Sequence, residues 1–429
     1  MRVRVAALCL LLAACSRGEN LGARPPLAEP RRPDVLGGGG VRRDAPTVRV
    51  GIAVDTTTVT VGAAADFELR RMTGDVLARG RTGEVWMLTR VAVGGVRIAR
   101  PGGEEQYELP VRVTTGAQDF IEIAGRRYRG HALITARGAD RLTAVNVVEL
   151  EHYLLGVVPR EMGRRPASEI EALKAQAVAA RTYAVGNLGG RDEQGFDFYA
   201  TVMDQVYGGT ADEDSIVSRA VLATRGEIIT YQGSPILAYY SSTCGGHTAD
   251  IEKSWPHRAP QPYLRGVSDQ VPGTDQYYCE SSSRFHWRTE WTREQLLAVL
   301  AQTQAAHTRN QVTTASRVTD VRLSRRPSGP ERAIVEVDVD GRTITLRGDS
   351  IRWVLRPAPG PAILNSSLIT SLAATRADGR VQRLAVEGGG WGHAIGMCQV
   401  GAMGRARAGQ SYRDILLEYY TDTRIERAY

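Results

Sequence analysis

One stretch near the middle of the chain, residues 147–190, constrains the fold more than any other. It reads VVELEHYLLGVVPREMGRRPASEIEALKAQAVAARTYAVGNLGG. Its first part, Val147–Leu155, is short and apolar with helical spacing. Pro159 is predicted to end this helix, because proline disfavours the helical conformation of the residue before it. We therefore expect Glu161, two residues further on, in a loop between two helices.

A second helix follows this loop. Ser168 stands three residues ahead of Glu171, which is the spacing of a capping box, and Gly189–Gly190 end the periodic run. The face expected to pack inward consists mostly of alanine, so another element must approach it closely; it comprises Leu173, Ala177, Ala180 and Ala184.

Three polar side chains are threaded among these small residues: Lys174, Gln176 and Arg181. A solvated polar side is one interpretation, because charged residues on helices usually face water. The other interpretation is functional. Lys174 is one of only two lysines in a chain with 54 basic residues, and lysine is a compact point donor where arginine is a planar fork.

The two segments ELEHYLLGVVPREM and ALKAQAVAARTYA together closely resemble the core motif of the SpoIID/LytB family. This family comprises stage II sporulation protein D and the amidase-enhancer proteins of the bacterial cell wall. The resemblance implies a peptidoglycan-active protein whose catalytic acid is the glutamate of the PREM motif, Glu161. Some members hold zinc with a histidine–cysteine pair where this chain reads FYATVMDQVYGG; neither residue is present there, so we expect no zinc at that position.

Two further stretches resemble the same family. SSTCGGHT is similar to its SSxGGxT signature, and GGGWGHAIGMCQVGAMGRA to its closing GxGxGHGxGMSQxGAxxxA signature. In the second, Ala394 replaces a glycine and Cys398 replaces the common serine. The functional candidates that these glycine-rich stretches contribute are Ser242, Trp391, His393 and Gln399.

The N-terminus is predicted to be a targeting segment. Arg2 and Arg4 precede a short apolar run, and LAAC ending at Cys15 resembles the cleavage site of a bacterial lipoprotein. Residues 1–15 would then be the signal segment with Cys15 lipidated; ordinary signal cleavage is the alternative. Residues 16–46, rich in glycine, proline and arginine, read as a flexible tether. We expect an exported lipoprotein of the cell envelope, on the periplasmic or extracytoplasmic side of its membrane.

The remaining chain predicts an α+β fold. Residues 47–146 read as a β-rich part of about seven short antiparallel strands, followed by the SpoIID/LytB core at 147–279. A small α+β insertion at 280–380 separates this core from its closing part at 381–429. The net charge is +7 over 429 residues, and the basic residues form no continuous block. No nucleic-acid partner is therefore predicted.

Three cysteines remain after the N-terminal pair: Cys244, Cys279 and Cys398. Disulfides persist in exported proteins, and a Cys244–Cys279 bridge with Cys398 free is preferred because those two lie in one loop-rich stretch. The alternative is a metal site that uses His247 with these cysteines. The spacings match no standard zinc pattern, so neither a metal nor another cofactor is expected.

By resemblance, the predicted activity is that of a lytic transglycosylase. Glu161 would protonate the glycosidic oxygen and then act as base for the 6-hydroxyl of the muramic acid, giving an anhydro sugar without a second carboxylate. The residues expected to bind or orient the glycan are Lys174, Gln176, Arg181, Ser242, His393 and Gln399. The alternatives are a glycan-binding enhancer that has a wall amidase as partner, or a tethered structural lipoprotein.

Overall fold

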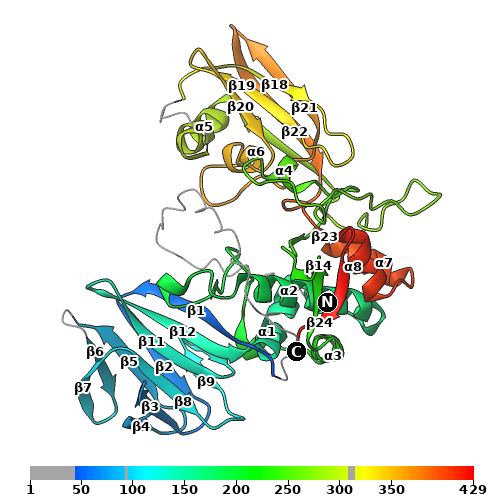
Figure 1. Cartoon of the computed structure of the whole chain (residues 1–429). Helices are drawn as coiled ribbons and strands as arrows, with labels where there is room; N and C mark the ends of the chain where they lie inside the picture. Colours follow the sequence, from blue (N-terminus) through cyan, green and yellow to red (C-terminus); the bar gives the residue numbers. More distant parts are fainter. Residues whose placement is uncertain (1–43, 92–94, 308–314) are drawn as a thin grey trace, which may run out of the picture.

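The computed structural model describes residues 44–91, 95–307 and 315–429. A β-rich part comes first, a helical core follows, and a second α+β unit interrupts that core before the C-terminal residues return to it (Figure 1). The predicted α+β class, with its β-rich N-terminal part, is confirmed.

The β-rich part forms two sheets that share one core. Phe67 and Trp86, from different sheets, pack with ring centroids 4.8 Å apart. One sheet has the order β13-β1-β12-β11-β8-β3-β4 and the other β10-β9-β2-β5-β6-β7. Their strands from this part are β1 (Thr47–Thr56), β2 (Thr58–Ala63), β3 (Phe67–Arg71), β4 (Val76–Gly80), β5 (Val85–Arg90), β6 (Gly95–Arg100), β7 (Gly103–Glu108), β8 (Val111–Thr115), β9 (Ile121–Ile123), β10 (Arg126–Tyr128), β11 (His131–Arg137) and β12 (Arg141–Glu149).

The sequence pattern underestimated the number of these strands. Twelve lie within the described residues between Thr47 and Glu149, in place of about seven expected from alternation. The shortest, β9 and β10, have three residues each, too few for a period-2 pattern to register. The last strand also runs to Glu149 and joins the first helix directly at Leu150.

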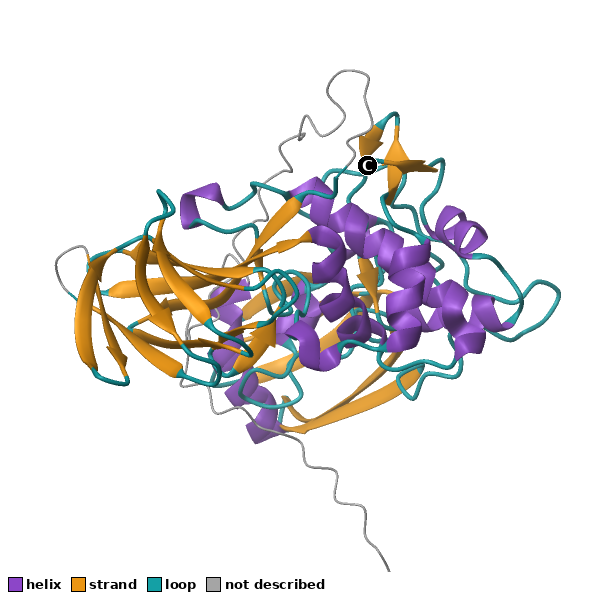
Figure 2. Ribbon diagram, turned by 90° about the horizontal axis from the view of Figure 1, so that it is seen from below, coloured by secondary structure: helices purple, strands orange, loops and turns teal. Residues whose placement is uncertain are grey.

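The helical core gathers around one central helix (Figure 2). Its α-helices are α1 (Leu150–Met162), α2 (Ile170–Asn187), α3 (Ser215–Ala223), α4 (Ile251–Ser254), α7 (Gln399–Arg407) and α8 (Tyr412–Tyr419). Short 3-10 turns lie at η2 (Ala167–Glu169), η3 (Asp192–Gln194) and η4 (Gly209–Asp212). The short strands of this region are β13 (Phe198–Tyr199), β14 (Glu227–Tyr231), β15 (Ser234–Pro235), β16 (Tyr240–Ser241), β23 (Met397–Cys398) and β24 (Arg424–Arg427).

The central helix is α2, and it is enclosed on all sides. It packs against α1, α3, α7, α8 and β14, and its alanines let these neighbours approach closely. Gln176 and Arg181 have no exposed surface, so the interpretation of α2 as a helix with a solvated polar side is wrong for both. This enclosure explains why its hydrophobic pattern is not confined to one face.

The predicted capping box is also wrong. Neither η2 nor α2 has a side-chain cap, and α2 begins at Ile170, after the 3-10 turn that contains Ser168. Glu171 instead accepts hydrogen bonds from the Nζ of Lys174, at 2.7 Å, and from the backbone N–H of Tyr412, at 2.9 Å. Glu171 therefore bonds to Lys174 and to the first turn of α8, and forms no local capping box.

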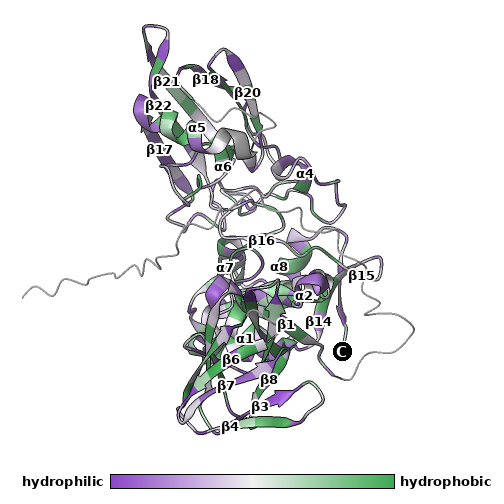
Figure 3. Ribbon diagram, turned by 90° about the vertical axis from the view of Figure 1, so that its left-hand side faces the viewer, coloured by the Kyte–Doolittle hydropathy of each residue, from purple (hydrophilic) through white to green (hydrophobic). Residues whose placement is uncertain are grey.

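The inserted unit has a hydrophobic core of its own, formed by buried residues between Trp287 and Val386. Figure 3 shows hydrophobic segments in its strands as well as in the helices around α2. The two sheets have the orders β17-β22-β21 and β18-β19-β20. The elements are β17 (His286–Thr292), α5 (Arg293–His307), β18 (Val318–Arg325), β19 (Ile334–Val339), β20 (Arg342–Arg347), α6 (Ser350–Val354), β21 (Ile369–Ala377) and β22 (Arg380–Gly389).

Candidate functional site

Glu161 lies in the last turn of α1, not in a loop as predicted, because the helix continues through Pro159 to Met162. Proline removes one backbone hydrogen bond from a helix interior and strains it. Buried side chains on both sides of the proline, among them Val158 and Met162, hold this turn against the core. Gly163, with φ +69°, ends the helix and donates its N–H to the carbonyl of Pro159 at 2.9 Å.

The carboxylate of Glu161 is bound by donors from two distant segments. The backbone N–H of Val206 donates to Oε1 at 3.2 Å, and the side-chain amide of Gln399 donates to Oε2 at 3.5 Å. The same amide nitrogen of Gln399 also donates to Oε1 of Gln176, at 3.3 Å. Gln176 and Gln399 are buried, and Glu161 is half-buried.

A chain of polar side chains lies next to this carboxylate. The hydroxyl of Tyr153 donates to Gln205 Oε1 at 3.2 Å, and Gln205 Nε2 donates to the hydroxyl of Tyr240 at 3.0 Å. Burial first, and then the charge of Glu161, hold the pKa of Tyr240 well above its usual range. The site thus surrounds one carboxylate with neutral amides and phenols.

Burial raises the pKa of Glu161 above the usual range of a glutamic acid. The hydrogen bonds from Val206 and Gln399 favour the charged form and oppose this shift only in part. A carboxyl group that holds its proton toward neutral pH can act as a general acid.

The closing glycine-rich stretch brings Gln399 to Glu161. β16 and β23 pair in parallel, with Ser241 opposite Cys398, so Ser242 and Gln399 follow side by side. The N–H of Val400 donates to the carbonyl of Ser242 at 3.0 Å. A side chain at Gly392, where φ is +116°, would lie 2.7 Å from Cβ of Ser241, so this close approach requires glycine.

Ala394 is another position in this stretch where the backbone has a positive φ. It adopts φ +60°, a conformation that glycine takes more readily. This position is where the chain departs from the glycine of the family signature, and the positive φ is a conformation that glycine favours.

Two of the predicted glycan-binding residues lie elsewhere in the core. Arg181 is fully buried and forms a two-pronged ion pair with Glu151, with both N–O distances 2.8 Å. Its remaining donors bond to carbonyls of Val221 and Glu227. Lys174 pairs with Glu171 at 2.7 Å and lies over the ring of Tyr412.

His393 and Trp391 occupy a separate part of the closing stretch. The Nδ1 of His393 accepts the N–H of Ile395 at 3.0 Å, and its ring packs 4.9 Å from that of Trp255. Trp391 stacks under the guanidinium of Arg284, 4.1 Å from the ring centroid. Of the six predicted binding residues, the structure therefore brings Gln176 and Gln399 to Glu161 and places Ser242 beside Gln399.

Three side chains of the polar chain beside Glu161 were not predicted from the sequence as site residues: Tyr153, Gln205 and Tyr240. The donor from Val206 is its backbone N–H, so the identity of the side chain at this position could not indicate the contact. Only the resemblance around Gln205 could have pointed to this side of the site.

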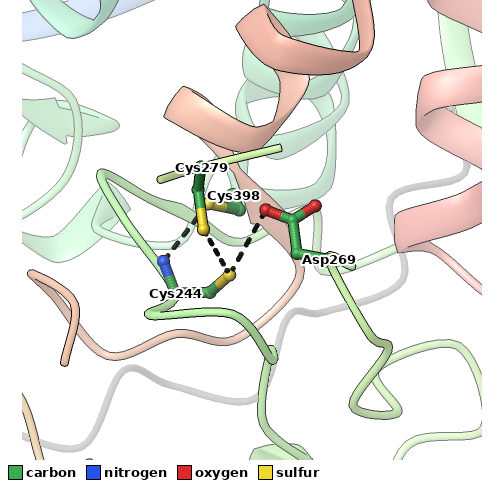
Figure 4. Close-up of side chains that lie close together, drawn as sticks. All are labelled: Cys244, Asp269, Cys279 and Cys398. Carbon is green, nitrogen blue, oxygen red and sulfur yellow. Dashed lines mark hydrogen bonds between the residues drawn. The ribbon is translucent and has the colours of Figure 1, made fainter. Parts of the chain in front are cut away.

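The three remaining cysteines meet at one buried place, together with Asp269 (Figure 4). The sulfur atoms of Cys244 and Cys279 lie 3.6 Å apart and are not bonded to each other. Their predicted disulfide stays a prediction, although the two side chains are adjacent. His247, named with the cysteines as an alternative metal ligand, lies outside this group.

The predicted lipidation site, Cys15, lies outside the described residues. Among the helices that are described, none is both long and apolar enough to cross a membrane.

The fold and site define an α+β protein with one half-buried carboxyl group, of raised pKa, among amides and phenols. Residues 138–231 match the family described as Stage II sporulation protein, and residues 264–396 match a Domain of unknown function (DUF8618). The chain belongs to the SpoIID/LytB family.

Its relatives support this membership. It is 30% identical over 301 residues to Stage II sporulation protein D of Bacillus subtilis (strain 168), which covers 66% of this chain and 76% of that protein. It is 32% identical to an uncharacterized protein of Brachyspira hyodysenteriae, over 72% of this chain and 74% of the relative. It is 29% identical to the Amidase enhancer of Bacillus subtilis, but spans only 40% of that protein.

Proposed function

We propose that this protein is a peptidoglycan lytic transglycosylase, anchored in the cell envelope, in which Glu161 is the general acid and base. The observation that carries the proposal is the environment of Glu161. Its carboxyl group is buried enough to raise its pKa, yet two donors, Val206 and Gln399, fix both of its oxygens.

This environment suits a reaction with a single carboxylate. Most glycosidases use two carboxyl groups, one as acid and one as nucleophile or base. Burial, Val206 and Gln399 shift the pKa of Glu161, and no second carboxylate is among these causes. Asp204, two residues before Val206, is held by Arg191 and by the hydroxyl of Tyr183. The second role then falls to a group of the substrate.

In the proposed reaction, protonated Glu161 gives its proton to the glycosidic oxygen that leaves the muramic acid. The resulting carboxylate takes the proton from the 6-hydroxyl of the same sugar, which attacks the anomeric carbon. The C–O bond to the leaving sugar breaks, an intramolecular C–O bond forms, and Glu161 recovers its proton. Gln399 and the N–H of Val206 stabilise the transient carboxylate, because hydrogen bonds to the charged form favour it.

The experiment is an analysis of the products of the purified protein on glycan strands, both intact and stripped of stem peptides. Anhydro-muramyl ends support the proposal, and newly formed reducing ends contradict it.

The second candidate function is a glycan-binding enhancer of a wall amidase. The similarity to a protein named Amidase enhancer favours it. This function predicts that the protein sediments with glycan strands and releases no product from them. Addition of a wall amidase should then raise the release of stem peptides above the rate of the amidase alone.

A further inference from the structure

A compact group of metal-ligand side chains includes none of the groups that donate to Glu161. It consists of Cys244, Asp269, Cys279 and Cys398, all buried, and their ligand atoms lie within 4.8 Å of one another. The four residues come from four separate places in the chain and point toward one another (Figure 4). Burial of this many ionisable groups at one point is rare unless they are paired or bind a metal.

We propose that these four side chains bind one zinc ion, with three thiolates and one carboxylate as ligands. Neighbouring ligand atoms around tetrahedral zinc lie about 3.6 to 3.8 Å apart, given its usual bonds to sulfur and oxygen. Cys244 Sγ lies 3.6 Å from Cys279 Sγ and 3.6 Å from Oδ2 of Asp269. Two edges of the ligand set therefore already have the length that tetrahedral coordination requires.

The two oxygens of Asp269 are divided between different partners. Oδ1 accepts a hydrogen bond from the hydroxyl of Tyr419 at 2.6 Å and one from Nε of Arg405 at 3.4 Å. Oδ2 faces the thiol of Cys244. A ligating carboxylate is commonly held in this way, with outer partners on one oxygen and the metal on the other.

Cys398 is arranged as a thiolate ligand. Its Sγ accepts the backbone N–H of Cys244 at 3.2 Å and that of Gly401 at 3.3 Å. Cys398 also stands at the N-terminus of α7, where the helix dipole favours negative charge. These donors and Arg405 offset part of the negative charge that three thiolates and a carboxylate would retain around a divalent ion.

Without a cation, the cluster places acidic groups in a medium that disfavours their charged forms. All four residues are buried, Asp269, Cys279 and Cys398 with no exposed surface. A bound cation would balance the charge of their deprotonated forms.

The ligand set selects among metals. Thiolates disfavour magnesium and calcium, which prefer oxygen ligands, and three sulfurs with one oxygen in tetrahedral positions suit zinc. The Cys244–Cys279 disulfide, preferred from the sequence because both residues lie in one loop-rich stretch, is the competing arrangement. It would use two of the three sulfurs and leave Cys398 and Asp269 buried without a shared partner.

The proposed ion would tie the closing stretch to the loop-rich segment between Cys244 and Cys279. Cys398 directly precedes Gln399, whose amide contacts Glu161. The zinc would therefore be structural, with its four positions filled by protein, and would fix the start of α7. The proposal does not depend on the glycan-cleaving function.

The test is metal analysis of the purified full chain, kept reduced, followed by replacement of zinc with Co²⁺. We expect about one zinc per chain, and a cobalt spectrum with thiolate charge-transfer bands and the strong visible bands of tetrahedral coordination. Cys279→Ser and Asp269→Asn should lose or weaken the metal and alter the cobalt spectrum. His247→Ala, close in sequence but outside the cluster, should leave both unchanged.

The result that would overturn the proposal is a folded, reduced chain that takes up neither zinc nor Co²⁺. A Cys244–Cys279 disulfide found by peptide mapping in protein isolated from the envelope, with no metal present, would overturn it as well. Where a variant does not fold, the charge-transfer intensity of the wild-type cobalt protein still decides, because it reports the number of bound thiolates. None of these measurements uses a glycan, so they are independent of the transglycosylase assay.

Discussion

The amide nitrogen of Gln399 lies 3.5 Å from Oε2 of Glu161, although 238 residues separate the two in the chain. Gln399 is the first residue of α7 and Glu161 lies in the last turn of α1. The contact joins the closing stretch to the core motif across the whole inserted unit. The chemistry proposed for Glu161 therefore depends on residues from both sides of the inserted unit.

Replacement of Glu161 by glutamine is expected to abolish glycan cleavage while fold and glycan binding are kept. Glutamine preserves the shape and a carbonyl acceptor but cannot deliver a proton. The rate of anhydro-muramyl release should fall by about a hundred- to ten-thousandfold, the usual contribution of general acid catalysis. Stability should change by under about 1 kcal/mol, measured by urea denaturation.

The matched control is Glu418→Gln, which alters a half-exposed carboxylate on α8 and should leave the rate unchanged. Release at the wild-type rate by the Glu161→Gln protein would show that another group supplies the proton.

The pH dependence of cleavage should carry the signature of a raised carboxyl pKa. The general acid must be protonated, so activity should fall as pH rises through the pKa of Glu161, above the range of an ordinary glutamic acid. Gln399→Leu removes a hydrogen-bond donor that lowers the pKa of Glu161. The fall in activity at alkaline pH should therefore move to higher pH, and the rate of cleavage should drop. The control is Gln410→Leu, which removes an amide that contacts Tyr278. It should leave the pH of this fall unchanged.

The same shift predicts how stability varies with pH. The carboxyl group has a higher pKa in the folded chain than in the unfolded chain. Between these two pKa values the folded chain binds more protons than the unfolded chain, so the free energy of unfolding declines as pH rises through that window. Urea denaturation of wild type and Glu161→Gln across this range should show a smaller decline in the variant. An equal decline of stability with pH in the two proteins would contradict the raised pKa of Glu161.

Arg181 is expected to contribute to folding and not to glycan binding. Its guanidinium and the carboxylate of Glu151 are 0% and 2% exposed. Removal of one partner of such a pair typically costs about 3–5 kcal/mol, because it leaves an unpaired buried charge. Arg181→Ala should therefore unfold at much lower urea concentration. A stable Arg181→Ala protein with weakened glycan binding would instead support a glycan-binding role for Arg181.

Membrane attachment through Cys15 remains to be tested. The LAAC sequence and the apolar run before it predict lipidation at this residue. Cys15→Ser should lose acyl labelling with a radioactive or clickable fatty acid, and the mature protein should leave the membrane fraction. Labelling and processing equal to wild type would refute the lipoprotein assignment.

The sequence by itself determined the elements with dense local patterns. The alanine-rich α2 occurs where periodicity predicted a helix, and the β-rich part occurs at 47–149 where alternating residues predicted strands. The family motif also selected Glu161 without any knowledge of its surroundings. These features are encoded in contiguous residues, so a short window carries the whole signal.

Tertiary structure alone decided the rest. Core packing carries α1 through Pro159, and Glu171 bonds to Lys174 and to the backbone of α8 where a capping box was predicted. Burial turns Arg181 from a plausible glycan ligand into half of an interior ion pair. Asp269, which no spacing rule pairs with the cysteines, joins their cluster only in the folded chain. Each outcome depends on contacts between residues far apart in sequence, whose energies no local pattern contains.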